Sequence, residues 1–185
     1  IEKALAGVGS SSQTDGGTAA RVFAAMATWL QEKTAPVFVV ATANAVTSLP
    51  PELIRRGRWD EVFFLDLPGL QERIDIFRIH LLKCRRDPEG FDLIRLAEAC
   101  PGFSGAEIEQ ALIAGLYDAF DEDRALCDDD IIGQIQTIVP LSRTMDESVK
   151  ALRSWSLTRA RPASDERMGA ASRQPRRGRT LRPVT

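Results

Sequence analysis

The sequence predicts an α/β protein in which two strands of a parallel sheet come first and a bundle of helices follows. Residues 36–43 (PVFVVATA) form a continuous apolar run rich in β-branched side chains, which is typical of a strand buried on both faces. Beyond Pro68 and Gly69, apolar side chains recur at every third or fourth position, which is the period of an amphipathic helix. We therefore expect the chain to divide near residue 68.

The first part is expected to hold one helix and two strands. Residues 7–17 are rich in Gly and Ser and predict a solvent-facing loop. Apolar side chains then recur at helical spacing over residues 18–33, and a proline at position 36 ends that helix before the strand over 36–43. Residues 48–58 predict a turn around a short helical segment, and the apolar run at 62–67 predicts the second strand.

The second part is expected to be helical as far as about residue 155. The predicted helices, each bounded by turn or capping residues, cover about residues 70–81, 91–100, 104–120, 128–139 and 146–155. The clearest boundary is a capping box, in which Ser104 can satisfy the N–H group of Glu107 while the Glu107 side chain reaches back. Residues 159–185 are rich in Arg, Ser and Pro and poor in large apolar side chains, so we expect a disordered tail there.

The composition excludes several classes of protein. With 185 residues, 44% of them hydrophobic and 27% charged, the chain has the profile of an ordinary globular protein. No run of about 18 apolar residues occurs, which excludes a membrane-spanning helix and predicts no membrane partner. Three cysteines without CxxC spacing and a single histidine argue against a disulfide framework and against a metal site, and they favour a reducing cytoplasm as the location.

The net charge of −2 averages two unlike regions. Residues 151–185 hold nine of the 24 basic residues and two of the 26 acidic ones, a net charge of +7, so the residues before them carry −9. The chain begins at Ile1 without an initiator Met or a signal-peptide pattern, and we therefore expect that it was cut from a longer protein.

Polar side chains that suit phosphate chemistry stand next to the predicted strands. Asn44 directly follows the first strand, where a neutral amide can orient a water molecule or can simply cap a turn. Arg55, Arg56 and Arg58 follow on a glycine-containing turn, where guanidinium groups can stabilise the charge on a transferring phosphoryl group. A solvated basic turn, neutralised by the acidic residues after it, is the alternative.

The order of these motifs resembles that in the second half of an AAA+ ATPase module of the classical AAA clade. The motifs are the strand that ends at Asn44, PELIRRGRWDE (51–61), the strand that ends in LP (67–68), QERIDIFRIHL (71–81) and GFSGAEIEQAL (102–112). Because several separate motifs occur in the right order over residues 1–160, the resemblance is specific. More narrowly, the chain resembles an uncharacterised AAA+ family encoded in cyanobacterial and plastid genomes.

This resemblance implies an architecture. Residues 1–68 would be the C-terminal part of the α/β sheet domain of an AAA+ P-loop NTPase, residues 69–158 the α-helical lid, and residues 159–185 a disordered basic tail. The two strands would be the fourth and fifth of the AAA+ sheet, which a missing P-loop strand normally separates. Because buried parallel strands need paired edges, we expect the lid (about 70–157) to fold on its own while residues 1–67 are poorly ordered or mispaired.

The resemblance also implies catalytic roles. Asn44 matches the sensor-1 residue, which positions the attacking water. Arg55 and Arg58 match the two arginine fingers, which reach the γ-phosphate of a nucleotide bound by the adjacent subunit of a ring. Arg56 stands where the family usually has proline, so a structural or electrostatic role is expected for it.

Four further residues match nucleotide-binding positions of the lid. Ile76 matches a residue that lines the base pocket, and His80 matches one that contacts the ribose and the adenine. Gly105 and Ala106 match the sensor-2 region, where small residues at a helix N-terminus let the backbone approach a nucleotide closely. For His80 the alternative is a lone histidine whose hydrogen bonds are satisfied within the protein.

The implied function is ATP binding and hydrolysis by a ring of AAA+ subunits, expected to be a homo-oligomeric hexamer that remodels a protein substrate. The implied cofactors are ATP and Mg²⁺, held mainly by Walker A and Walker B residues. The GK[ST] signature of a Walker A loop does not occur in this sequence, so these 185 residues alone are expected to be inactive.

Two other functions stay open. Without a P-loop, the residues could form a non-catalytic, AAA+-derived module that binds partner proteins. The arginine-rich segment from Arg173 to Arg182 could bind the phosphates of a nucleic acid. However, the rest of the chain is acidic and no aromatic residues interleave with these arginines, so nucleic acid is not an expected partner.

Overall fold

The computed structural model of the protein describes residues 16–46, 49 and 57–164. Most of the predicted Gly/Ser loop, most of the turn predicted at 48–58 and the tail beyond residue 164 lie outside these residues. The predictions that rest on Arg55 and Arg56 therefore fall on residues that the structure does not describe.

The chain divides into two compact units. The first unit comprises Ile1–Phe63 together with Arg159–Arg161, and the second comprises Phe64–Thr158 and Pro162–Thr185. The division after Phe63 lies close to the boundary that the sequence predicts at residue 68.

The first unit contains the predicted N-terminal helix. Helix α2 spans Gly16–Glu32, so it begins two residues before the predicted start and confirms the helical period read from the sequence. Its buried side chains are Ala27 and Leu30, each 5% exposed, and partly buried Val39 and Trp59 pack against them. This cluster is small, because most of the apolar side chains that follow α2 stay in contact with solvent.

The strand predicted over residues 36–43 is absent, and the prediction is wrong for this structure. The backbone from Val37 to Ala43 forms no regular element, and Phe38 is 92% and Val40 75% exposed. A strand buried on both faces needs hydrogen-bonding partners along both edges. Among the described residues the only strands are β1 and β2, and they pair with each other, so this apolar run has no strand to join.

The second predicted strand is present in a shorter form. Strand β1 (Phe63–Phe64) pairs with β2 (Arg161–Pro162) in a two-stranded sheet. The N–H group of Arg161 donates to the carbonyl oxygen of Val62 at 2.9 Å, and that of Ala163 donates to Phe64 at 2.9 Å, so the two strands run parallel. Strand β2 corrects the prediction of disorder for residues 159–164, because the chain is hydrogen-bonded there, and the rest of the predicted tail lies outside the described residues.

Helices make up nearly all of the chain between the two strands. Six α-helices and one 3₁₀-helix are described there: α4 (Leu70–Lys83), η2 (Pro88–Gly90), α5 (Leu93–Ala99), α6 (Gly105–Asp121), α7 (Asp128–Thr137), α8 (Leu141–Thr144) and α9 (Asp146–Arg159). Each of the five helices predicted from the sequence is therefore confirmed, and the short helix α8 is the one that the sequence analysis missed. Helix α8 begins directly after Pro140, a position at which the sequence predicts only the end of the preceding helix.

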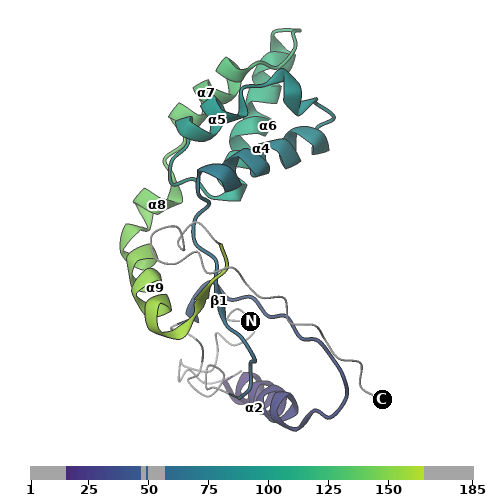
Figure 1. The fold of residues 1–185 in the computed structure, drawn as a ribbon, viewed down its shortest axis with the longest axis vertical. Coiled ribbons are helices and arrows are strands. Elements are labelled where there is room, and N and C mark those ends of the chain that lie inside the picture. The colour runs from purple at the N-terminus through teal and green to yellow at the C-terminus, as the bar shows by residue number, and fades with distance from the viewer. Residues whose placement is uncertain (1–15, 47–48, 50–56, 165–185) are drawn as a thin grey trace, which may run out of the picture. The chain divides into compact units, whose positions relative to one another are not determined.

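Helices α4 to α7 enclose one hydrophobic core and lie together in the upper part of Figure 1. Its largest side chains, all 0% exposed, are Phe77, Leu81, Leu96, Ile108, Leu112 and Ile131. Each helix contributes at least one of them. Burial of a side chain of this size stabilises the folded state by about 1.5–3 kcal/mol, so this shared core is the main source of order in the second unit.

The capping box predicted at the start of α6 is formed. The Ser104 backbone N–H donates to Oε2 of Glu107 at 2.7 Å, and the Glu107 N–H donates to Oγ of Ser104 at 3.4 Å. The second carboxylate oxygen of Glu107 accepts a hydrogen bond from the N–H of Leu141 at 2.6 Å. One glutamate therefore fixes both the N-terminus of α6 and the start of α8.

Two arginines hold the segment that leads into α4. The Nε of Arg73 donates to the carbonyl oxygen of Ala97 at 2.8 Å, and its Nη1 donates to that of Pro68 at 2.9 Å. On α9, the Nε of Arg153 donates to Oδ1 of Asp66 at 3.0 Å. These bonds fix residues 66–68 against the helices of the second unit.

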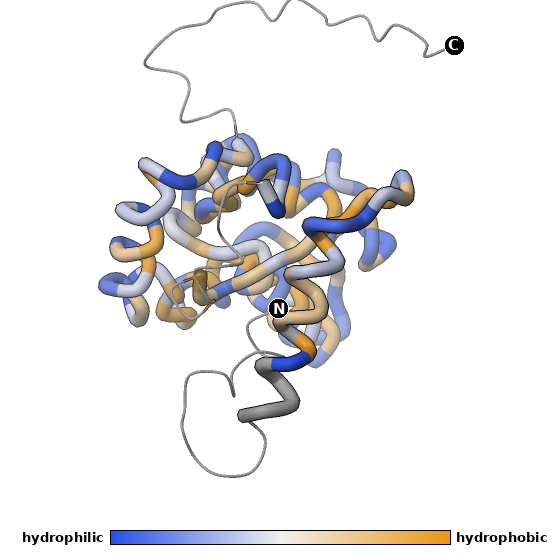
Figure 2. The backbone as a smooth tube through the Cα atoms, turned by 90° about the horizontal axis from the view of Figure 1, so that it is seen from below, coloured by the Kyte–Doolittle hydropathy of each residue, from blue (hydrophilic) through white to orange (hydrophobic). Residues whose placement is uncertain are grey.

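Hydrophobic and hydrophilic residues are mixed along the described helices, as the alternating colours of the tube in Figure 2 show. Within the described part of the chain, none of the helices combines the length and the apolar character that crossing a membrane requires.

Candidate functional site

The facing sides of α4 and α6 bring together three of the four residues predicted to bind nucleotide: Ile76, His80 and Gly105. A Cβ atom built on Gly105 would lie 3.7 Å from Cδ1 of Ile76, so these two residues are in contact distance. One turn further along each helix, Nδ1 of His80 lies 3.0 Å from Oε1 of Glu109. These two pairs lie one helical turn apart on the facing sides of α4 and α6.

Gly105 is the first residue of α6, and its packing leaves room for a larger residue. The 3.7 Å separation from Ile76 is an ordinary van der Waals distance, so an alanine would fit here. The backbone φ of Gly105 is not in the left-handed region that favours glycine. Neither packing nor backbone conformation therefore requires glycine at this position.

His80 has an internal partner, as the alternative interpretation of this residue requires. Its side chain is only 13% exposed, and that of Glu109 is 43% exposed. The ammonium group of Lys83 lies 3.9 Å from the same carboxylate oxygen of Glu109. The site therefore combines one imidazole, one carboxylate and one ammonium group at the junction of the two helices.

The residues predicted to carry catalysis lie in the first unit. Asn44 is exposed on a bend that follows the irregular segment from Val37 to Ala43. Arg58 is half-buried and follows Gly57, whose φ of +100° is a conformation that glycine adopts readily. Arg55 lies outside the described residues, so the sensor and finger roles of these residues stay predictions.

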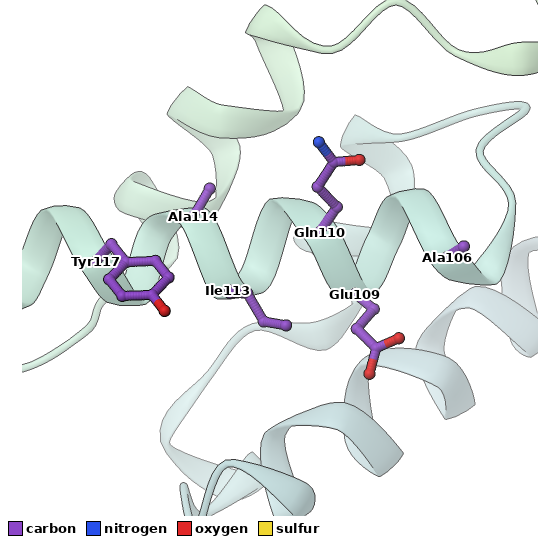
Figure 3. A pocket seen from close by; sticks show the side chains of 6 residues that line it. All are labelled: Ala106, Glu109, Gln110, Ile113, Ala114 and Tyr117. Atoms are coloured by element: carbon purple, nitrogen blue, oxygen red, sulfur yellow. The ribbon is translucent and has the colours of Figure 1, made fainter.

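One face of α6 also lines an open surface pocket of about 390 Å³, shown in Figure 3. The lining residues are Ala106, Glu109, Gln110, Ile113, Ala114 and Tyr117. They follow the spacing of three and four residues that places side chains on one face of a helix. Ala106 was expected at the site from the sequence, and Glu109 was not.

Glu109 was missed because sequence reasoning followed only the motif residues at the start of α6. The signal that would have found it is its position four residues after Gly105, which places both on the same face of the helix. Which helix that face meets depends on tertiary packing, and this sequence carries no local sign of it.

The buried cysteine of the second unit has no features of a nucleophile. The Sγ of Cys100 donates to the carbonyl oxygen of Leu96 at 3.4 Å, and the residue is 0% exposed. Burial raises the pKa of the Cys100 thiol to about 11, so the thiol stays protonated at neutral pH. Within the described ranges, no three His, Cys, Asp or Glu side chains gather in a group that could hold a metal ion.

Residues 3–67 match the family described as "ATPase family associated with various cellular activities (AAA)". The chain is 52% identical over 166 residues to an "Uncharacterized AAA domain-containing protein ycf46" of Pyropia yezoensis, a match that covers 89% of this chain and 33% of the relative. A protein of the same name from Gracilaria tenuistipitata var. liui is 49% identical over 149 residues, covering 80% of this chain and 30% of the relative.

A more distant relative bears a different name. An "ATP-dependent zinc metalloprotease FtsH" of Karelsulcia muelleri is 42% identical over 83 residues, which cover 42% of this chain and 13% of the relative. The chain spans about a third of the length of the two curated relatives that it matches over most of its residues. The resemblance predicted from the motifs is thereby confirmed: residues 3–67 match the AAA ATPase family, and most of the chain is similar to AAA domain-containing proteins.

Proposed function

We propose that these residues are the sensor, finger and lid part of an ATP-hydrolysing AAA module that works in a ring and remodels a protein substrate. The observation that carries the proposal is the contact between α4 and α6, which gathers Ile76, His80 and Gly105 at one junction. These are the lid positions at which the resemblance places the nucleotide. The match of residues 3–67 to the AAA family supports the same assignment.

In the proposed mechanism, the residues of the second unit hold the base and ribose side of the nucleotide. Ile76 offers an apolar surface beside the base, and His80 offers a polar ring atom for a hydrogen bond. Gly105 and Ala106 leave the backbone at the start of α6 open to close approach. ATP would be bound together with Mg²⁺, and the Walker residues that bind both are not part of this sequence.

The residues of the first unit would act on the reacting phosphate. Asn44 would orient the attacking water through its neutral amide. Arg55 and Arg58 would stabilise the charge that develops on the γ-phosphate of a nucleotide bound by the adjacent subunit. Movement of the lid would couple hydrolysis to work on the substrate.

The test uses a chimera in which the corresponding N-terminal residues of the Pyropia yezoensis relative precede Ile1. Arg58→Ala is expected to lower kcat by roughly 10³-fold, which is the contribution of a finger in other phosphoryl-transfer enzymes. Arg95→Ala is the matched control, because Arg95 is an exposed arginine on α5 that pairs with Asp129. Full activity of the Arg58→Ala chimera would exclude the finger role.

A mixing experiment separates action on a neighbour from action within one subunit. Chimeras carrying Arg58→Ala are mixed with chimeras whose Walker B glutamate is replaced, and each protein alone is expected to be inactive. If Arg58 acts on the neighbour, mixed rings regain activity, because each Arg58→Ala subunit receives a finger from its partner. If mixing restores nothing, the proposed action in trans is wrong.

A non-catalytic interaction module is the second candidate, and the exposed face of α6 favours it. Ile113 is 40%, Tyr117 72% and Phe120 82% exposed, which is unusual apolar exposure for three residues of one helix. Under this proposal, the chimera binds partners equally well with and without ATP. Replacement of Tyr117 and Phe120 by serine would weaken partner binding, and the chimera would show no ATP hydrolysis with or without these substitutions.

A further inference from the structure

One side of helix α6 is left uncovered by the other described elements. Ile113, Tyr117 and Phe120 recur at intervals of four and three residues, so their side chains lie on one side of the helix. The buried Ala111 and Gly115 lie on the opposite side. All three apolar side chains are exposed, and the first two also line the pocket of Figure 3. We call these three residues the α6 face.

The charge around the α6 face is strongly negative. Residues 117–130 hold seven acidic residues and one basic one. Asp121 follows Tyr117 by four residues and therefore lies beside it on the helix, and Asp123 comes two residues after the helix ends. Among the described residues, neither carboxylate has a hydrogen-bond or ion-pair partner. A segment that covers the α6 face must therefore bring positive charge and groups that pack on aromatic rings.

Arginine is the side chain that meets both requirements. Its planar guanidinium group pairs with carboxylates and also stacks on aromatic rings, whereas the ammonium group of lysine acts mainly as a point charge. This chain contains an arginine-rich segment, residues 173–182, with five arginines and no acidic residue. The proposed mechanism of ATP hydrolysis makes no use of these arginines.

The connecting chain is long enough for contact within one molecule. The five arginines stand 9 to 18 residues beyond Ser164, the last described residue. An extended chain spans about 3.3 Å per residue, so the segment can extend to about 60 Å from Ser164. A small domain is roughly 30 Å across, so this length allows the segment to reach a surface of the second unit.

We propose that the arginine-rich segment docks on the α6 face of its own molecule. Its guanidinium groups stack on the two aromatic rings and pair with the carboxylates of Asp121 and Asp123. The docked segment covers the surface that the second candidate function offers to partner proteins, so it competes with them. The inference goes beyond ATP hydrolysis, because that mechanism does not use the α6 face.

The first arm of the test observes the α6 face directly. Tyr117 is the only tyrosine in the sequence, so the full chain labelled with ¹³C in its tyrosine ring gives NMR signals from this face alone. The neutral-tail variant carries Arg173→Gln, Arg176→Gln, Arg177→Gln, Arg179→Gln and Arg182→Gln. We expect its ring signals to differ from those of the unaltered chain at low salt. Identical ring signals in the two chains would overturn the proposal.

Salt and lysine separate the two parts of the contact. The difference between the two chains should shrink at about 1 M NaCl, where the screening length falls to about 3 Å. Replacement of the same five arginines by lysine keeps the charge and loses most of the stacking, so it should give a smaller difference than arginine. A difference equal to that of the unaltered chain would overturn the stacking on the aromatic rings.

The second arm asks whether the α6 face or the overall charge attracts the segment. A synthetic peptide of residues 173–182, added to the neutral-tail variant, should move the ring signals toward those of the unaltered chain. Asp121→Asn together with Asp123→Asn should weaken this binding roughly threefold to tenfold. The matched control, Glu98→Gln with Glu147→Gln, removes the same charge at two other exposed positions and should leave binding unchanged. Equal weakening by the two pairs would overturn the assignment to the α6 face.

Dilution identifies the molecule that supplies the segment. A contact within one molecule is independent of protein concentration, so dilution of the unaltered chain by about tenfold should leave its ring signals unchanged. Signals that move on dilution toward those of the neutral-tail variant would overturn docking within the molecule, because the segment would then come from a second copy. The samples contain no nucleotide and no partner protein, so the result does not depend on either candidate function.

Discussion

Similar apolar segments are buried in the second unit and exposed in the first. In the second unit, Phe77 and Leu81 of α4 are fully buried among helices that come from many positions along the chain. In the first unit, Phe38 and Val40 lie in a run that is at least as apolar, and both are strongly exposed. Apolar character alone therefore does not decide burial.

The difference shows that backbone hydrogen bonding limits which apolar segments can become buried. A helix satisfies its N–H and C=O groups within itself, so an amphipathic helix needs only a neighbour for its apolar face. A buried strand needs neighbouring strands, because its backbone N–H and C=O groups must form hydrogen bonds with them once water is excluded. The second unit has four helices that supply such neighbours, and the apolar run in the first unit has no described strand beside it.

The largest expected effect compares two identical substitutions, one in each unit. Phe77→Ala removes a 0% exposed ring and should lower the free energy of unfolding of the helical bundle by about 3–5 kcal/mol. Phe38→Ala removes a 92% exposed ring and should change it by less than about 0.5 kcal/mol. Urea unfolding followed by far-UV circular dichroism measures both. A large loss for Phe38→Ala would show that residues 36–43 are packed after all, and the comparison would fail.

An intermediate effect is expected where α6 packs closely against α7 at Gly115. A Cβ on Gly115 of α6 would lie 3.2 Å from backbone atoms of Asp130 and Ile131 in α7. This distance is shorter than an ordinary van der Waals contact, and the backbone of α7 cannot move away easily. Gly115→Ala should therefore destabilise the bundle by about 1–3 kcal/mol. Gly133→Ala on α7 is the control, because a Cβ there meets nothing within 4 Å.

The control should raise stability by about 0.5–1 kcal/mol, since alanine is the better helix former. Thermal unfolding of the two variants thus gives shifts of opposite sign. If both glycines respond alike, the tight approach of α6 and α7 is not what stabilises the second unit.

The smallest effect concerns the loop that joins α6 to α7. Asp130, whose side chain is 8% exposed, accepts two hydrogen bonds of 2.6 Å from the guanidinium of Arg124 and one of 2.9 Å from the N–H of Cys127. The hydrogen bonds from Arg124 hold the pKa of the Asp130 carboxyl well below its ordinary value of 3.8.

A depressed carboxyl pKa stabilises the folded state above the ordinary pKa and loses this contribution as the pH falls below it. The thermal midpoint should therefore drop as the pH is lowered from neutral to about 3, and Asp130→Asn should show a smaller drop. Asp129→Asn is the matched control, since Asp129 is a 78% exposed partner of Arg95 and exposed pairs contribute little. Equal pH dependence in Asp130→Asn and the unaltered chain would contradict this account.

Sequence reasoning succeeded where the determining contacts are local. The capping box of Ser104 and Glu107 predicted the start of α6. The motif residues Ile76 and Gly105 lie near each other in the structure, and their assignment to a nucleotide site stays a prediction. It did not find Glu109, because the choice of partner for His80 is made by the packing of two helices.

By itself, the sequence determined the helices, their caps and the resemblance to AAA ATPases, because periodicity, capping and motif order are properties of neighbouring residues. The tertiary structure decided which apolar runs became buried, and among the residues that it describes no strand lies beside residues 36–43. It also paired Arg161 with Val62 and His80 with Glu109, which are distant along the chain. Such pairings depend on where whole elements pack, and no local pattern encodes that.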